Sequence, residues 1–250
     1  MVEELLKYKA VVLLVWAILF LVWEYLAPAS KYLENCTRQD KWRRYGRNLG
    51  LLALTFLLSP TLIAAITVFS TQFGPNWREE FLNGYTIGGW WIVIDLILLD
   101  FFIYWWHRVN HVLPFLWRFH EVHHLDETLD VTTATRFHFG EVIMSAIVRA
   151  GFVIVLDIPL ISVVIFETMI LLSSVFQHSN IRLSDKVDGV LSWLIVTPNW
   201  HWLHHHAVRE DTDSRYANTL TIWDRLFGST NSNKRQYDMK IGVVGRKERD

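Results

Sequence analysis

The chain has 250 residues, 52% of which are apolar, and its formal net charge at pH 7 is −1. This length fits one large domain or two small ones. A net charge near zero gives no indication of a nucleic-acid partner. The single cysteine, Cys36, excludes an intramolecular disulfide and a cluster of thiolate metal ligands.

Three long apolar stretches in the first 106 residues predict membrane-spanning helices. Residues 10–27 are almost wholly apolar, residues 48–70 carry no charged side chain, and residues 88–106 carry only Asp95 and Asp100. Each stretch matches the roughly 20 residues that a helix needs to cross a bilayer. The alternative is a set of buried helices in a soluble bundle, but the first two stretches lack the polar stripe that such helices show.

A fourth apolar stretch, 141–177, is too long for one span and predicts a helical hairpin. Residues 157–159 interrupt it near the middle with Asp-Ile-Pro, which leaves two legs of about 19 residues, or roughly 28 Å each. Arg149 and Glu167 each lie nine residues from Ile158, so antiparallel legs place them at the same depth. Because an unpaired charge inside a membrane is costly, we expect these two side chains to pair.

The basic residues predict how the spans are oriented. Lys and Arg side chains are concentrated in residues 28–47, whereas the next loop, 71–85, has only Arg78 and two glutamates. Loops rich in Lys and Arg stay in the cytoplasm. The polar segments 107–140 and 178–250 are then expected on the cytoplasmic side as well.

The histidines predict a metal site. All 11 lie between residues 107 and 206, and eight of them are spaced three or four residues apart, so that they share a helix face within each cluster. These clusters are His107 and His111; His120, His123 and His124; and His201, His204 and His205. Eight imidazoles exceed the needs of one four-coordinate zinc, so we expect two adjacent metal ions. Imidazole suits iron, zinc, copper and nickel alike, so the ligand type leaves the metal open.

With these three histidine clusters, called the first, second and third box below, the sequence resembles the fatty acid hydroxylase / sterol desaturase family of membrane di-iron oxygenases. The matching segments are the three boxes, 107–111, 117–124 and 201–205, and the flanking segments 130–138, 178–180 and 223–228. The resemblance implies a four-helix-type transmembrane bundle under a cytosolic cap, two irons, O₂ and an external electron donor. It also implies hydroxylation or desaturation of a lipid, and zinc could replace iron in a purified sample.

Two isolated histidines are added to the predicted ligands. His138 and His178 each lie 20 residues from Ile158, so the hairpin brings them to equal depth beside the three boxes. The family resemblance supports both as ligands. His206, next to the third box, is expected not to bind metal.

Several polar residues near the boxes are candidates for supporting roles. Asp100 and Tyr104 fall on the helix face of the first box, so Asp100 is expected to fix the tautomer of an imidazole, as is Glu141 beside His138. Three acidic residues near the second box could be metal ligands but are interpreted as solvated loop charges; they are Glu121, Asp126 and Glu127.

The sequence therefore predicts an all-α, multi-span transmembrane bundle with a cytosolic histidine-rich helical cap. Residues 1–94 are expected to form N-terminal spans and a basic loop, 95–228 the catalytic domain, and 229–250 a polar tail. No nicotinamide- or haem-binding motif is present, so electrons are expected from a ferredoxin or a cytochrome b5-type protein. A bacterial inner membrane is favoured over the endoplasmic reticulum. The alternatives are a metal transporter or storage protein, a bis-histidine haem protein and a zinc-dependent lipid hydrolase.

Overall fold

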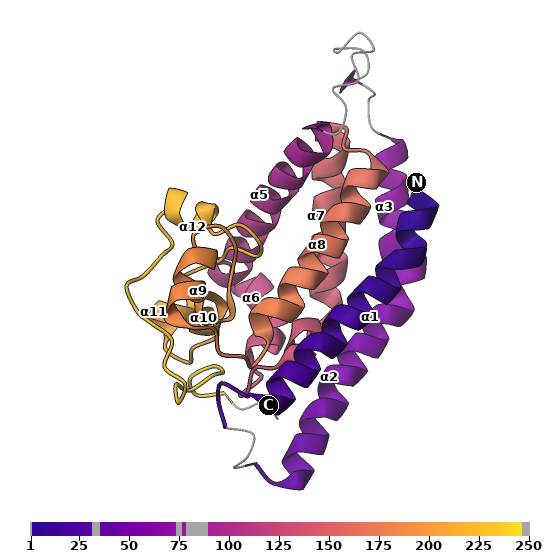
Figure 1. The fold of residues 1–250 in the computed structure, drawn as a ribbon. Coiled ribbons are helices and arrows are strands. Elements are labelled where there is room, and N and C mark those ends of the chain that lie inside the picture. The colour runs from indigo at the N-terminus through magenta and orange to yellow at the C-terminus, as the bar shows by residue number, and fades with distance from the viewer. Residues whose placement is uncertain (1, 32–35, 74–76, 79–89, 247–250) are drawn as a thin grey trace.

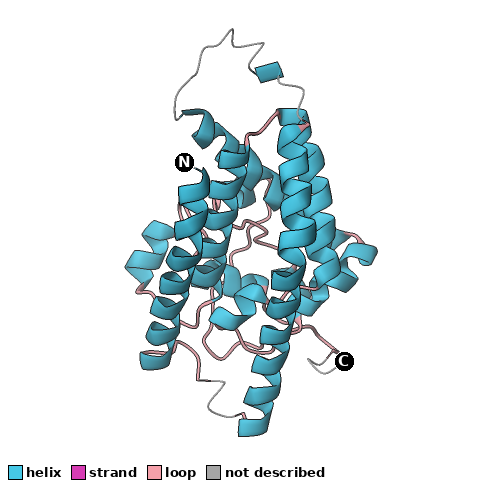
Figure 2. Cartoon of the chain, turned by 90° about the vertical axis from the view of Figure 1, so that its right-hand side faces the viewer, coloured by secondary structure: helices cyan, strands magenta, loops and turns pink. Residues whose placement is uncertain are grey.

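A computed structural model describes residues 2–31, 36–73, 77–78 and 90–246. Within these ranges the chain is helical and forms no strand, only three isolated β-bridges. Figures 1 and 2 show long helices side by side, and Figure 1 shows a group of short helices, α9 to α12, against one flank of them. The predicted all-α fold is confirmed. Most of the loop 71–85, used above for orientation, lies outside the described residues.

Among the described residues, four helices are long and apolar enough to cross a membrane. The first is α1 (Val2–Leu26), and the second is a continuous helix made of α2 (Arg38–Leu58), a π-helical turn (Ser59–Ile63) and α3 (Ala64–Gln72). The π-turn contains Pro60, whose nitrogen has no hydrogen to donate to the regular helical ladder. The predicted span 48–70 lies inside the second of these helices, and the predicted span 10–27 extends one residue past the end of α1.

The other two candidate spans are the legs of the predicted hairpin, α7 (Phe139–Leu156) and α8 (Leu160–His178). Between them Asp157 adopts a left-handed conformation with φ of 51° and ends α7, a conformation that aspartate tolerates better than most residues. Ile158 is buried in the turn. The turn therefore lies where the Asp-Ile-Pro sequence predicted it.

The predicted charge pair between the two legs is confirmed. The guanidinium of Arg149 lies 3.0 Å from Glu167 Oε1. The second oxygen of Glu167 is bound by a residue that the sequence did not predict, Lys9 of α1, at 3.2 Å. One carboxylate thus joins three of the long helices.

The predicted span 88–106 corresponds to α5 (Trp90–Val112), which is not among the four candidate spans. Residues before Trp90 in this stretch lie outside the described ranges. Leu99 of α5 packs with Val153 of α7 and Phe166 of α8 in an apolar cluster. The buried face of α5 also carries both histidines of the first box, so this helix leads from the bundle to the cap.

The cap consists of short helices beside the end of the bundle where α5 stops and α7 begins (Figure 1). These are α6 (Pro114–His124), a 3₁₀ turn (Val131–Thr135), α9 (Asp185–Leu191), α10 (Pro198–His204), α11 (Arg209–Thr212) and α12 (Ile222–Leu226). The predicted polar tail packs onto this cap. Arg235 stacks 3.5 Å above the ring of Trp202, and the amide of Ala207 donates to the carbonyl of Lys240.

Candidate metal centre

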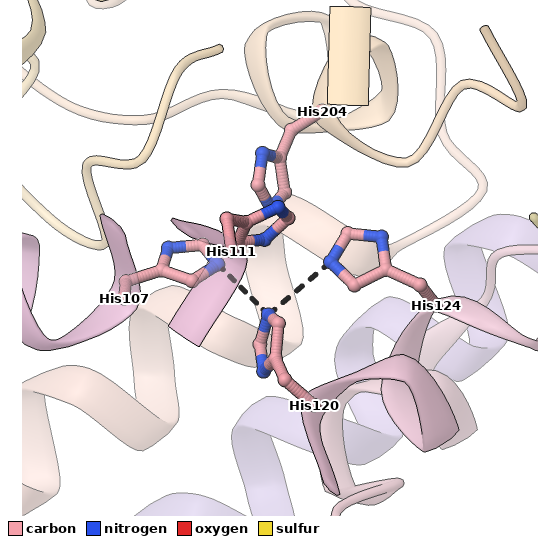
Figure 3. A group of neighbouring side chains, drawn as sticks. All are labelled: His107, His111, His120, His124 and His204. Atoms are coloured by element: carbon pink, nitrogen blue, oxygen red, sulfur yellow. Dashed lines mark hydrogen bonds between the residues drawn. The ribbon is translucent and has the colours of Figure 1, made fainter. Parts of the chain in front are cut away.

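Five histidines from α5, α6 and α10 turn their rings toward one point (Figure 3). They are His107, His111, His120, His124 and His204, and one nitrogen of each lies within 4.8 Å of the corresponding nitrogen of every other. We call these residues the five-histidine group. All five side chains are buried.

Four more histidines form a second group beside the first. They are His123, His178, His201 and His205, again with one nitrogen each within 4.8 Å of the others. We call these residues the four-histidine group. Both groups draw on α6 and α10, and the rings of His124 and His205, one from each group, stack 4.3 Å apart. The chain therefore places two groups that could each hold a metal ion next to each other.

The separations between ring nitrogens fit bound metal ions. The Nε2 atom of His120 lies 3.1 Å from that of His107 and 3.2 Å from that of His124. His178 Nε2 lies 3.1 Å from His123 Nε2 and 3.0 Å from His201 Nε2. Two imidazole nitrogens on one metal at about 2.1 Å are separated by about 3.0–3.4 Å for angles between square and tetrahedral. The measured spacings fall in that range.

Two further nitrogens are buried without the partner that a polar atom needs. Within the described ranges, the Nε2 atoms of His111 and His204 have no hydrogen-bond partner, although both belong to the five-histidine group. A buried polar atom without a partner calls for an explanation such as an ion. A metal at the centre of the group would satisfy both atoms.

Hydrogen bonds on the outer side of the rings fix which nitrogen faces inward. In the five-histidine group, His107 Nδ1 donates to the Tyr216 carbonyl at 2.8 Å, and His204 Nδ1 donates to the Ser214 carbonyl at 2.7 Å. A carbonyl only accepts, so each Nδ1 carries the proton and each Nε2 presents a lone pair to the centre.

Two rings of the four-histidine group have outer partners of the same kind. His123 Nδ1 donates to the Arg136 carbonyl at 3.1 Å, and His178 Nδ1 donates to the Ser174 carbonyl in the preceding turn of its own helix at 2.7 Å. The Nδ1 atoms of His201 and His205 have no hydrogen-bond partner within the described residues.

Burial keeps the cap histidines in the form that binds metal. Desolvation lowers the pKa of His204 to about 3 and holds the pKa values of other cap ligands well below the ordinary value; these are His123, His124, His201 and His205. Neighbouring imidazoles add to the effect, because two adjacent rings resist protonation together. Metals bind neutral imidazole, so these five histidines are in the form that can bind a metal near neutral pH.

Of the three supporting residues predicted from sequence, Glu141 lies against a predicted ligand, His120. Its Oε1 is 2.8 Å from His120 Nδ1, the position from which a carboxylate orients a ring. Asp100 instead accepts from the Leu220 amide and the Trp223 indole, and the Tyr104 hydroxyl lies 2.8 Å from that of Ser229. The contacts of Asp100 and Tyr104 thus hold the cap against α5. Asp100 was expected to fix the tautomer of an imidazole, but its partners among the described residues include no imidazole nitrogen.

Two other histidines lie outside both groups. The Nδ1 atom of His138 accepts from the Gly140 amide at 3.0 Å and caps the N-terminus of α7. His206 Nδ1 pairs with Asp211 at 2.7 Å. The structure therefore gathers nine of the ten predicted ligands and places His138 at a helix cap, because α7 starts one residue after it.

The interpretation of the acidic residues near the second box was wrong for two of the three. Asp126 is fully buried and paired with Arg44 at 2.6 Å. Glu121 is also buried and lies 3.6 Å from Arg246. The two partners come from distant parts of the chain, Arg44 from α2 and Arg246 from the tail, so the sequence near the second box does not reveal them. Arg44 was counted above only as a loop charge.

Comparison with known proteins agrees with this geometry. The model of a family described as fatty acid hydroxylase matches residues 92–229, more than half of the chain. The chain belongs to the fatty acid hydroxylase family. All nine histidines of the two groups lie inside the matched region, whereas α1 to α3 lie outside it.

Curated relatives share parts of the chain. An ornithine lipid hydroxylase of Rhizobium tropici is 29% identical over 62% of this chain and 46% of its own length. An alkylglycerol monooxygenase of Xenopus tropicalis is 33% identical over 56% of this chain and 30% of its own length. A very-long-chain aldehyde decarbonylase of Oryza sativa subsp. indica is 24% identical over 76% of this chain and 29% of its own. The aligned region thus spans less than half of each relative. No solved structure matches the chain.

Proposed function

We propose that this membrane protein is an oxygenase that uses two histidine-bound irons and O₂ to hydroxylate a lipid at an unactivated C–H bond. The observation that carries the proposal is the pair of adjacent buried groups of five and four imidazoles. Irons held there would activate O₂, and activated oxygen is what attacks such a bond. The protein supplies the ligand geometry and an environment without water.

The chain's own residues have separable tasks in this proposal. The nine histidines present ring nitrogens to the two centres, and Glu141 accepts a hydrogen bond from His120 Nδ1 so that Nε2 faces inward. Asp100 binds the Leu220 amide and the Trp223 indole and so holds the cap over the centre. Each ligand side chain is almost fully buried, which strengthens electrostatic interactions inside the site.

Hydroxylation is favoured over desaturation by the relatives. Two of them are named as a lipid hydroxylase and a monooxygenase, and both names describe insertion of oxygen. We infer that the substrate is the alkyl or acyl chain of a membrane lipid. A carbon chain of this kind reaches the site from the bilayer that the long apolar helices occupy.

The proposed cellular arrangement follows from charge. The end of α1 and the start of α2, where the basic residues of 28–47 lie, are at the same end of the bundle as the cap (Figure 1). Since loops rich in Lys and Arg remain in the cytoplasm, we place the cap there. The ornithine lipid hydroxylase of Rhizobium tropici supports a bacterial inner membrane as the location. A cytoplasmic ferredoxin or cytochrome b5-type protein would then deliver electrons.

The direct test compares lipids from cells with and without the gene, grown in ordinary oxygen and in ¹⁸O₂. The proposal predicts a lipid that gains one oxygen atom, with the heavy isotope appearing in ¹⁸O₂, and its absence with the His205→Ala variant. A product that has lost two hydrogens would make the protein a desaturase. Formation without O₂, or an added oxygen atom that stays unlabelled in ¹⁸O₂, would indicate that the oxygen comes from water and overturn the proposal.

A further inference from the structure

A buried ion network joins α2 to the loop that follows the second histidine box. Arg44 of α2 is 4% exposed and grips Asp126 with two nitrogens, at 2.6 and 2.8 Å. A third nitrogen binds Asp130 at 2.5 Å, and the same guanidinium donates to the Thr128 carbonyl at 2.7 Å. A two-nitrogen contact to a carboxylate is strongly directional, so this loop is fixed against α2.

One helical turn later, Asn48 continues the network. Its amide nitrogen donates to Asp126 at 3.2 Å and to the Thr132 hydroxyl at 2.9 Å. Its amide oxygen accepts from Arg136 at 2.9 Å. Asn48 is fully buried, and it is bonded to both ends of the segment between Asp126 and Arg136.

The segment fixed in this way carries the acceptor for a ligand ring. Arg136 also donates to the Val122 carbonyl at 2.7 Å, which ties it to α6. Its own carbonyl then lies 3.1 Å from His123 Nδ1. The path from α2 to His123 therefore consists of two contacts, from Asn48 to Arg136 and from Arg136 to the ring.

The four-histidine group has little other support of this kind. His178 donates to a carbonyl of its own helix, and the Nδ1 atoms of His201 and His205 have no partner within the described residues. The Arg136 carbonyl is thus the acceptor that a separate segment gives to this group. In the five-histidine group, by contrast, Glu141, Tyr216 and other residues supply such acceptors.

We propose that Arg44 and Asn48 are positioning residues for the metal bound by the four-histidine group. They act through the Arg136 carbonyl, which orients His123. The inference rests on the proposed function only in requiring that both groups bind metal. Both residues lie on α2, outside the region 92–229 that the family model matches.

The test measures metal binding, which is independent of turnover. The full chain in detergent or nanodiscs is dialysed against a series of buffered free Zn²⁺ concentrations, and bound zinc per chain is determined by mass spectrometry. We expect two zinc ions in the unchanged protein. In Asn48→Ala we expect one to bind as before and the other about 10-fold more weakly, the lower end of the cost of losing an outer partner, because the Arg136 carbonyl remains but is no longer held in place. The second variant is Arg44→Lys, which keeps the positive charge but loses the bidentate contact with Asp126.

The matched control is Ser162→Ala. Ser162 is also fully buried and donates to the buried Asp95, which Arg78 pairs at 2.6 Å. This network lies near the start of α8, far along the helix from His178. Ser162→Ala should keep both zinc ions at unchanged affinity, so that a general loss of stability is separated from a loss of ring orientation.

A double-variant comparison identifies the metal that is weakened. Adding Asn48→Ala to His123→Ala should change zinc binding no further, whereas adding it to His204→Ala should weaken the second ion as well. Equal weakening of both ions by Asn48→Ala, or no weakening, would overturn the inference. An unchanged protein that binds no metal would instead refute the proposed function.

Discussion

The two histidine groups use the same ligand type but are supported differently. Four of the five rings in the five-histidine group have an outer partner supplied by another segment of the chain, as His120 has in Glu141 and His107 has in the Tyr216 carbonyl. In the four-histidine group, among the residues that the structure describes, only the partner of His123 comes from a separate segment. Since outer partners set the tautomer and orientation of a ligand, the two metal sites should differ in how they respond to change.

Removing one ligand from each group should have the largest effect. We expect both His205→Ala and His124→Ala to abolish product formation. The protein should remain in the membrane, because neither histidine lies in a candidate membrane span. Zinc content should separate the two variants. His205→Ala leaves three ligands in its group and should lose one ion, whereas His124→Ala leaves four and should keep both at high zinc concentration. Product retained by either variant under limiting iron would contradict a shared catalytic centre.

Changing Glu141 should affect only the five-histidine group. Glu141→Ala removes the acceptor for His120 Nδ1 and should weaken one of two zinc ions about 10- to 100-fold. Glu141→Gln keeps an oxygen that accepts this hydrogen bond and should cost less. Zinc titration of both variants is the measurement. If the alanine and glutamine variants bind zinc equally well, the carboxylate does not orient the ring.

The charge pair of the hairpin should affect stability and leave both groups unchanged. Arg149→Met and Glu167→Gln should each destabilise the protein, and the double variant should cost less than their sum by about 0.5–3 kcal/mol. Glu167→Gln should cost more than Arg149→Met, because Glu167 also binds Lys9. Unfolding in detergent by denaturant, with zinc content alongside, measures both effects. Strictly additive costs would show that the contact contributes no coupling.

The smallest effect is expected from His206. It follows the third box directly, but its ring pairs with Asp211 and belongs to neither group. His206→Ala should keep two zinc ions and normal product formation, and should lower stability by about 1–3 kcal/mol, because a buried oxygen of Asp211 loses its donor. Loss of a zinc ion in this variant would mean that the third box binds metal through a different set of rings.

What could be predicted from the sequence was local periodicity. Spacings of three and four residues put ligands on shared helix faces, and the Asp-Ile-Pro interruption fixed the hairpin turn, from which the contact of Arg149 with Glu167 followed by counting residues. The same counting put His138 level with His178. It did not anticipate that α7 would begin at Phe139 and use His138 as its cap.

Contacts between distant segments could not be predicted in this way. Arg44 and Asp126 are 82 residues apart, and nothing in either local pattern shows that α2 lies over the loop after α6. Asp126 therefore resembled a solvated charge until a partner from another helix covered it. Asp100 fell on the ligand face of α5, but the cap supplies its partners, Leu220 and Trp223. A single sequence contains no signal for such pairings.

The contact of Arg44 with Asp126 and Asp130 also limits how this protein can be recombined. Residues 92–229 carry every ligand of both groups, so they look like a unit that could be transferred onto the membrane helices of another protein. Asp126 and Asp130 would enter such a chimera buried and without their cation, and a buried charge that has lost its partner is strongly destabilising. A working graft must therefore bring α2 with it, or replace both aspartates at the same time. Any lineage that exchanged its N-terminal helices would face the same requirement.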